Sequence, residues 1–159
     1  MWLLFELEAI FSVLLAQPVV LGKAPVTLPL LSREDQALNR RISEAARSPA
    51  QNVVLVLKGI EAQSRPEVSW EVHVEPAGAI PDAQGPHLVG VFSLFNSGRD
   101  PGEFLFVVDN AIAAAGKKDL QVRFVPISGV VVDGKPLPTE VRANVTIGAI
   151  SLALESAPR

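Results

Sequence analysis

The chain has 159 residues, of which 48% are hydrophobic and 19% charged, and its net charge is −3. This length favours a single domain with a hydrophobic core of its own. Acidic and basic residues are scattered along the chain, whereas nucleic-acid binding needs a basic stripe, so nucleic acid is not an expected partner. The absence of cysteine excludes disulfides and thiolate metal sites, but it does not fix the cellular compartment.

The first 16 residues are apolar on nearly every side and are interrupted only by Glu6 and Glu8. A secretory signal carries basic residues ahead of its apolar stretch, but the first basic residue here is Lys23. A membrane span needs about 20 apolar residues, and this stretch is shorter and carries two acidic residues. A membrane is therefore not an expected partner either. Four interpretations of residues 1–16 stay open: a buried or partner-docking segment, a degenerate signal, a membrane span, which is less favoured than the first two, or the start of a fragment. We expect the folded domain to span residues 17–159.

Two short elements and a helix are predicted in the first third of the chain. Residues 19–21 and 26–28 flank Gly-Lys-Ala-Pro and predict an edge hairpin, because Pro25 and Pro29 disfavour a central strand. Ser32, with Asp35 three residues later, predicts the N-cap of an amphipathic helix of about three to four turns that closes before Pro49. Its apolar positions are Leu38, Ile42 and Ala45.

The rest of the chain is typical of β-structure. Short apolar or alternating runs are separated by Gly/Pro loops, and a short helix is expected at 110–115, with Asp109 as its cap and Gly116 as its end. The expected fold is therefore all-β, an antiparallel β-sandwich of about eight strands with one peripheral amphipathic helix. The main runs cover residues 53–60, 68–75, 88–95, 103–108, 120–125 and 141–154.

One strand carries the residues that come nearest to a metal site. In the alternating run 68–75, Glu71, His73 and Glu75 share one face, so a small metalloenzyme is one hypothesis. A solvated strand face is the favoured interpretation. The second histidine, His87, follows Gly-Pro at a strand entrance and is predicted to hydrogen-bond to backbone. Two histidines in separate strands do not make a copper or zinc site by spacing, so no metal is expected on this chain.

Other chemistry finds little support in the sequence. There is no cysteine nucleophile, no Gly-x-Ser-x-Gly elbow and no phosphate-binding loop. The chain has no tyrosine, which weakens the case for a platform that stacks sugars or bases. The strand aromatics are instead predicted to lie in the core: Trp70, Phe92, Phe104, Phe106 and Phe124.

Several segments occur in an order that is informative. Residues 56–61 read Val-Leu-Lys-Gly-Ile-Glu, residues 69–72 read Ser-Trp-Glu-Val, and residues 85–95 run from Gly-Pro-His to Leu-Phe. Residues 106–116, 124–126 and 145–148 follow in turn. Over roughly residues 17 to 155, this order resembles the β-rich C-terminal domain of tyrosinases and polyphenol oxidases. In plants that domain is known by a Lys-Phe-Asp-Val tetrapeptide, whose lysine is replaced here by Ser69.

The resemblance implies a non-catalytic role. In that family the C-terminal domain covers a dinuclear copper site held by a separate helical domain, and it keeps the enzyme latent or aids its maturation. A copper pair needs about six imidazoles, and this sequence has two. Copper is therefore expected only on the partner, a tyrosinase-like copper oxidase core domain. The candidate partner-facing loop comprises Phe95, Asn96, Arg99 and Asp100, and a plain hairpin connection is the alternative for it.

A function from a different class stays open. The chain is alternatively a free-standing β-sandwich module that binds a sugar or a lipid. Clustered exposed aromatic residues or an acidic calcium-type loop would favour that module, and the sequence shows neither clearly.

Overall fold

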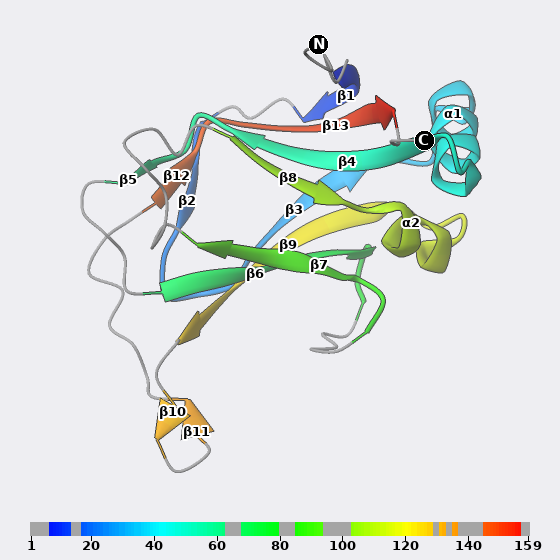
Figure 1. Cartoon of the computed structure of the whole chain (residues 1–159). Coiled ribbons are helices and arrows are strands. Elements are labelled where there is room, and N and C mark those ends of the chain that lie inside the picture. Colours follow the sequence, from blue (N-terminus) through cyan, green and yellow to red (C-terminus); the bar gives the residue numbers. More distant parts are fainter. Residues whose placement is uncertain are drawn as a thin grey trace.

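Two four-stranded antiparallel sheets pack face to face in the computed structural model (Figure 1). The structure describes residues 7–13, 17–62, 68–79, 85–93, 103–128, 131–132, 135–136 and 145–156. The first sheet has the strand order β1–β13–β4–β8 and the second has the order β3–β9–β6–β7. The first comprises β1 (Leu7–Val13), β13 (Ala149–Ser156), β4 (Gln51–Lys58) and β8 (Glu103–Val107). The second comprises β3 (Val26–Leu31), β9 (Leu120–Ser128), β6 (Val68–Pro76) and β7 (Leu88–Ser93).

Smaller elements complete the β-structure. A three-stranded sheet has the order β2–β12–β5, and β10 pairs with β11 as an antiparallel hairpin. These strands are β2 (Val19–Leu21), β12 (Val145–Ile147), β5 (Glu61–Ala62), β10 (Val131–Val132) and β11 (Lys135–Pro136). The predicted edge hairpin is wrong, because β2 pairs with β12 while β3 pairs with β9. The placement of β3 at a sheet edge is confirmed, and it agrees with Pro29 within the strand and Pro25 just before it.

The two helices lie together at one end of the sandwich (Figure 1). Helix α1 (Gln36–Arg47) begins later than predicted: its N-cap is Asp35, whose side chain accepts a hydrogen bond from the Leu38 N–H at 3.0 Å. Ser32 is therefore not the cap. Helix α2 (Asp109–Ala115) includes Asp109 as its first residue rather than as its cap. The Asp109 carboxylate instead accepts a hydrogen bond from the Val53 N–H at 3.1 Å, which ties α2 to β4.

The core lies between the two large sheets and is closed at one end by the helices. Trp70, Val72 and Val74 are fully buried on β6, as the alternation predicted, and Ile42 and Ala45 are buried on α1. The all-β antiparallel sandwich with a peripheral amphipathic helix is confirmed. The described part of the chain contains thirteen strands rather than about eight, because several are only two or three residues long.

Part of the apolar N-terminal segment belongs to the first sheet. Strand β1 pairs antiparallel with β13, with Leu7 opposite Glu155 and Val13 opposite Ile150. The division of the chain at residues 16 and 17 stays a prediction. No helix in the described ranges is both long enough and apolar enough to cross a membrane.

Two glycines meet where the chain leaves the first sheet. Gly59 has a φ of +64°, and a Cβ placed on it would come within 3.3 Å of the Gly148 Cα. The Gly148 N–H donates to the carbonyl oxygens of Lys58 and Gly59 at 3.0 and 3.1 Å. The two segments that contain these glycines are both part of the family resemblance, and the close backbone approach gives a physical reason for glycine in each.

Candidate functional site

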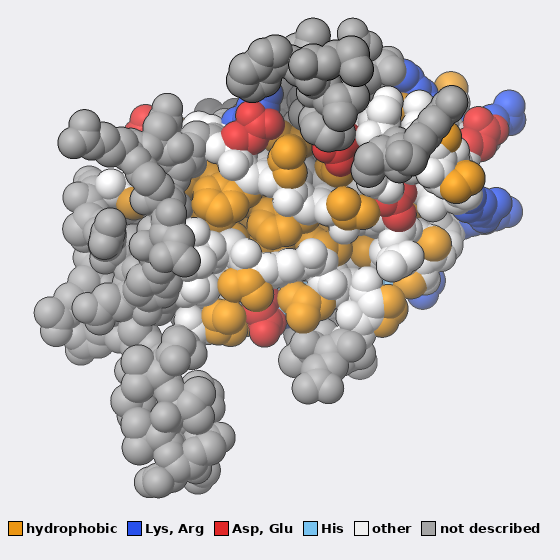
Figure 2. Space-filling view, viewed as in Figure 1, with side chains coloured by type: hydrophobic (Ala, Val, Ile, Leu, Met, Phe, Trp, Pro, Cys, Tyr) orange, Lys and Arg blue, Asp and Glu red, His pale blue; other side chains and the backbone are white. Residues whose placement is uncertain are grey.

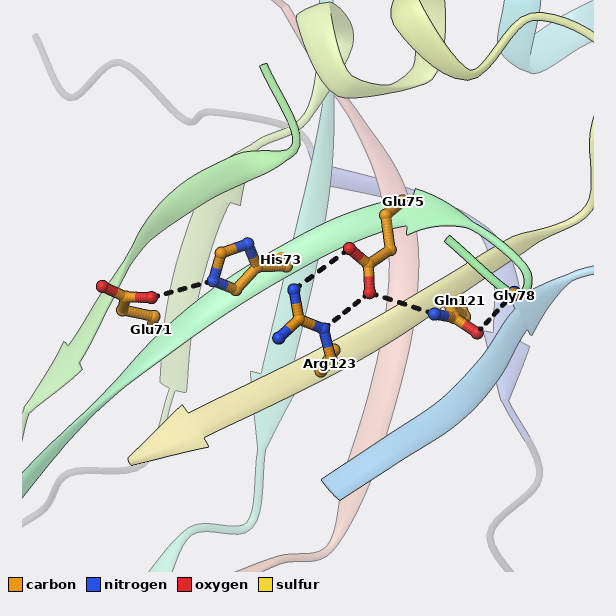
Figure 3. A network of polar contacts seen from close by, with 6 residues as sticks. All are labelled: Glu71, His73, Glu75, Gly78, Gln121 and Arg123. Atoms are coloured by element: carbon orange, nitrogen blue, oxygen red, sulfur yellow. Dashed lines mark hydrogen bonds and ion pairs between the residues drawn. The ribbon is translucent and has the colours of Figure 1, made fainter. Parts of the chain in front are cut away.

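The acidic and histidine residues of β6 form a polar network with β9 (Figure 3). The Arg123 guanidinium donates to both carboxylate oxygens of Glu75, with Nε–Oε1 and Nη2–Oε2 distances of 2.7 and 3.2 Å. Gln121 donates to the same carboxylate at 3.0 Å. Beside this pair, His73 Nε2 lies 2.9 Å from Glu71 Oε2. The antiparallel register places His73 opposite Arg123 and Glu75 opposite Gln121, so all five side chains share one face of the second sheet.

This face is not the solvated strand face that the sequence suggested. His73 is 1% exposed, Glu75 2% and Arg123 8%. Alternation shows which side chains share a face, but it does not show whether that face reaches water. Arg123 was missed because it is distant from Glu75 in the sequence. The signal that could have found it is the matching alternation of residues 120–125, which places polar side chains opposite polar side chains once the two strands pair.

The network has the character of a structural ion pair. Burial alone would raise the pKa of Glu75, but the hydrogen bonds from Arg123 and Gln121 and the Arg123 charge outweigh burial, and the pKa lies below its usual range. A carboxylate held ionised in this way is a poor general acid. Among the described residues, no group of three His, Asp or Glu side chains is arranged to hold a metal ion. The metalloenzyme hypothesis based on Glu71, His73 and Glu75 therefore gains no support.

The second histidine contributes to the fold through its backbone. The carbonyl oxygen of His87 accepts a hydrogen bond from the Val74 N–H at 2.8 Å. The ring Nδ1 of His87 is buried and has no hydrogen-bond partner in the described part of the chain, and the same holds for Nδ1 of His73. The predicted hydrogen bond from the His87 ring to backbone is thus not found at this atom.

The partner-facing loop predicted around Phe95, Asn96, Arg99 and Asp100 lies outside the described residues, but the strands on both sides of it are described. Strand β7 precedes the loop and is an edge strand of the second sheet, while β8 follows it and is an edge strand of the first. Both edges lie on the same side of the molecule, which faces the viewer in Figure 1.

Exposed aliphatic side chains gather on these two strands. Val91 on β7 is 50% exposed, and Leu105 and Val107 on β8 are 48% and 53% exposed. In the described part of the chain, the fourth large hydrophobic residue exposed to this degree is Val20 on β2. Figure 2 shows hydrophobic side chains gathered across the middle of this side of the molecule. We call this region, defined by Val91, Phe104, Leu105 and Val107, the β7–β8 edge surface. Phe104 packs against the core, whereas Leu105 and Val107 lie on the outer face of the first sheet and Val91 on the outer face of the second, opposite Glu71.

The apolar character of this surface continues into the first sheet. Leu105 lies opposite Val56 and Val107 lies opposite Val54 on the neighbouring strand β4. Val54 and Val56 form, with Ala153, a small buried cluster separate from the main core. The continuous apolar run at residues 104–108 is the signal that could have found this surface, since both faces of β8 carry hydrophobic side chains.

Aromatic side chains pack beneath the β7–β8 edge surface. The ring centroids of Trp70 and Phe92 lie 5.7 Å apart, and the Phe92 ring meets the partly buried Phe104 edge-on at 4.7 Å. Phe106 packs against Gly90 of β7 so closely that a Cβ there would lie 2.6 Å from its ring. Strands β7 and β8 are thus held together by side-chain packing although they belong to different sheets. The predicted core location of the strand aromatics is confirmed for Trp70, Phe92, Phe106 and Phe124, while Phe104 reaches the edge.

Comparison with solved structures identifies the fold. The chain superposes on recombinantly expressed latent aurone synthase, a polyphenol oxidase, with a TM-score of 0.54 and 18% identity over 91% of this chain. This chain has the fold of part of a polyphenol oxidase. A second structure of that enzyme, co-crystallised with hexatungstotellurate(VI), matches with a TM-score of 0.51 and 15% identity over 89% of this chain. Latent apple tyrosinase matches with a TM-score of 0.48 and 18% identity over 88% of this chain and 28% of its own.

The match is confined to a small part of the oxidases. The chain spans 27% of the first aurone synthase structure and 26% of the second. The resemblance to the β-sandwich domain of tyrosinases and polyphenol oxidases is confirmed at the level of the fold, and the coverage is consistent with a C-terminal domain alone. No protein-family model matches the sequence, and no curated protein matches it.

Proposed function

We propose that this chain is a non-catalytic accessory domain that docks on a tyrosinase-like copper oxidase core and covers its dinuclear copper site or aids its maturation. The observation that carries the proposal is the fold match to about a quarter of a latent polyphenol oxidase. The residues of this chain do not fit a copper pair, because such a pair needs about six imidazoles, and only His73 and His87 are present. The copper therefore belongs to the partner.

The β7–β8 edge surface is the docking surface that we propose. Docking by an accessory domain needs an apolar centre with little net charge. Phe104 lies between the two edge strands, with Leu105 and Val107 on the outer side of β8 and Val91 on the outer side of β7. Burying the exposed half of such an aliphatic side chain contributes about 1 kcal/mol, so Leu105 and Val107, which share one face of β8, together change affinity about thirtyfold. The predicted loop with Phe95, Asn96, Arg99 and Asp100 connects the same two strands, so both sets of residues belong to one docking face in this proposal.

Titration of the purified domain into a tyrosinase core tests this function, with diphenol oxidation and copper content as readouts. We expect saturable binding with a fall in activity, or a rise in copper loading when the two are co-expressed. No binding and no effect on either readout would leave only the similarity of fold, and a sugar or lipid ligand would then become the leading alternative.

A pair of variants tests the docking surface separately. The double variant Leu105→Asp/Val107→Asp places charge on the β8 side of the surface, and we expect it to weaken binding at least about tenfold. Val20→Asp is the matched control, because Val20 is equally exposed but lies on β2. An equal effect of both variants would contradict docking through β7 and β8. Loss of binding in Leu105→Asp/Val107→Asp alone, with an unchanged circular dichroism spectrum, would support it.

A further inference from the structure

A cleft of about 570 Å³ opens between α1 and the turn that follows α2. One wall is the Gly116–Lys117 turn. The other is a single stripe of α1 made by Gln36, Asn39, Arg40 and Ser43, at positions i, i+3, i+4 and i+7. This stripe lies on a different face of α1 from the buried Ile42 and Ala45.

The cleft is lined by cations and neutral polar groups. Its charged lining residues are Arg33, Arg40 and Lys117, and the lining in the described part of the chain includes no carboxylate. The nearest acidic group on the turn, Asp119, accepts a hydrogen bond from the Arg33 backbone N–H at 2.7 Å. Figure 2 shows Lys and Arg side chains gathered at the side of the molecule where the helices lie. Three cations against one neighbouring carboxylate, that of Asp119, leave an excess of positive charge around this concave surface, which concentrates anions.

Arg33 is held in place in the lining of this cleft. Its guanidinium donates to the carbonyl oxygens of Lys118 and Gly116, both at 2.8 Å, and to the side-chain oxygen of Asn39 at 2.9 Å. These bonds use three of the five N–H donors that a guanidinium carries. A cation held in place before its ligand arrives loses little conformational entropy on binding, which favours affinity.

We propose that this cleft binds a phosphate group, held by Arg33, Arg40 and Lys117 with Gln36 and Ser43 as neutral donors. The carbonyl groups at the end of α2 carry negative partial charge, which explains why cations such as Arg33 and Lys117 lie there. It does not account for Arg40, Gln36 and Ser43, which project from a different helix into the same space. Phosphate matches this set because it accepts several charge-assisted hydrogen bonds at once. The proposal does not depend on docking to an oxidase.

The test uses the full chain and two probes that carry the same chemical group. Pyrophosphate is titrated at constant ionic strength by calorimetry and by NMR, and phosphatidic acid vesicles are tested by co-sedimentation. Saturable binding of either probe, with amide shifts at Gln36, Ser43 and Gly116, supports the site. The probe that binds shows whether the phosphate belongs to a soluble anion or to a lipid headgroup.

Two double variants separate a built site from general electrostatics. Arg40→Gln/Lys117→Gln should weaken binding about tenfold or more, because each charge-assisted hydrogen bond contributes a factor of that order. Lys23→Gln/Arg47→Gln removes two exposed cations outside the cleft and should leave binding unchanged. Equal weakening by both double variants, or the absence of saturable binding by both probes, would overturn the proposal.

Discussion

Glu75 and Arg123 face each other at the centre of the second sheet with almost no exposure to water. Removing charges from water is costly, and their attraction repays that cost only when the geometry is good and the remaining hydrogen bonds are made. Here the pair is bidentate and Gln121 binds the same carboxylate, so the pair is well satisfied. Its stability contribution therefore depends strongly on both partners being present.

Glu75→Leu should lower the free energy of unfolding by about 3–5 kcal/mol, because it leaves the Arg123 charge buried without its partner. Glu75→Leu/Arg123→Leu should recover most of that loss. Urea denaturation of Glu75→Leu, Arg123→Leu and the double variant measures the coupling energy between the two side chains. If the double variant loses the sum of the two single losses, the two side chains do not act as a pair.

The lowered pKa of Glu75 also predicts how stability depends on pH. An acid whose pKa falls on folding stabilises the folded state above its ordinary value of about 4.5, and that stabilisation is lost as the pH falls through the lowered folded pKa. The stability difference between the wild type and Glu75→Gln should therefore be largest near neutrality and shrink in acid.

The pH dependence of stability of the wild type alone would combine the contribution of Glu75 with a contribution of opposite sign from Asp109. Burial raises the pKa of Asp109, despite hydrogen bonds from the N–H of Val53 and its own N–H, so protonation of Asp109 in acid favours the folded state. Both proteins contain Asp109, and subtraction removes its contribution. A difference that grows as the pH falls would contradict the assignment for Glu75.

At the scale of elements, α1 shows how close a sequence pattern comes to the actual helix boundary. Both Ser32 and Asp35 are good cap residues, and the spacing between them resembles a capping box. The structure uses Asp35 as the cap, while Ser32 Oγ accepts only a longer hydrogen bond of 3.3 Å from the Glu34 N–H. The sequence contains two signals for the start of the helix, and the structure uses the second.

Substitution of these two residues checks the assignment. Asp35→Ala should lower the free energy of unfolding by about 1 kcal/mol, as the loss of an N-cap does. Ser32→Ala should change it by a smaller amount. Thermal or urea unfolding of the two variants gives the comparison, and a larger loss from Ser32→Ala would move the helix start back to the predicted position.

The strands were predictable and their partners were less so. Alternation located the strand of Trp70 and its buried face, and the prolines located the edge position of β3. Pairing between distant strands depends on long-range packing that no local pattern records, which is why the hairpin of β2 with β3 was wrong and Arg123 was missed. Only part of the candidate docking site could be predicted from the sequence. The loop was selected from the resemblance, whereas the exposure of Leu105 and Val107 became known only from the structure.

At the scale of the whole molecule, the edges of the two large sheets are places where other strands can pair with the domain. Strands β7 and β8 form one pair of edges, and β1 closes the other side of the first sheet by pairing along β13 from Ile150 to Glu155. An unpaired edge offers a row of backbone donors and acceptors to any passing strand. The apolar N-terminal segment therefore serves, in part, as the cover of an edge.

A chain without residues 1–16 should expose the edge of β13. We expect a lower melting temperature and self-association that rises with protein concentration, measured by sedimentation velocity. Adding Ser151→Lys to the shortened chain should suppress association, because a lysine on an edge strand opposes further pairing and Ser151 lies opposite Ser12 of β1. A shortened chain that stays monomeric and equally stable would show that β1 does not protect this edge.

The contact of Trp70 with Phe92, and of Phe92 with Phe104, has a practical consequence for following the domain by fluorescence. The chain has no tyrosine and two tryptophans, so a Trp2→Phe variant emits from a single indole. The indole of Trp70 is fully buried, and the Phe92 ring lies between it and Phe104 at the edge where the partner is proposed to dock. A partner that displaces Phe104 should change the emission of this one residue, so that docking is observed optically with no dye attached.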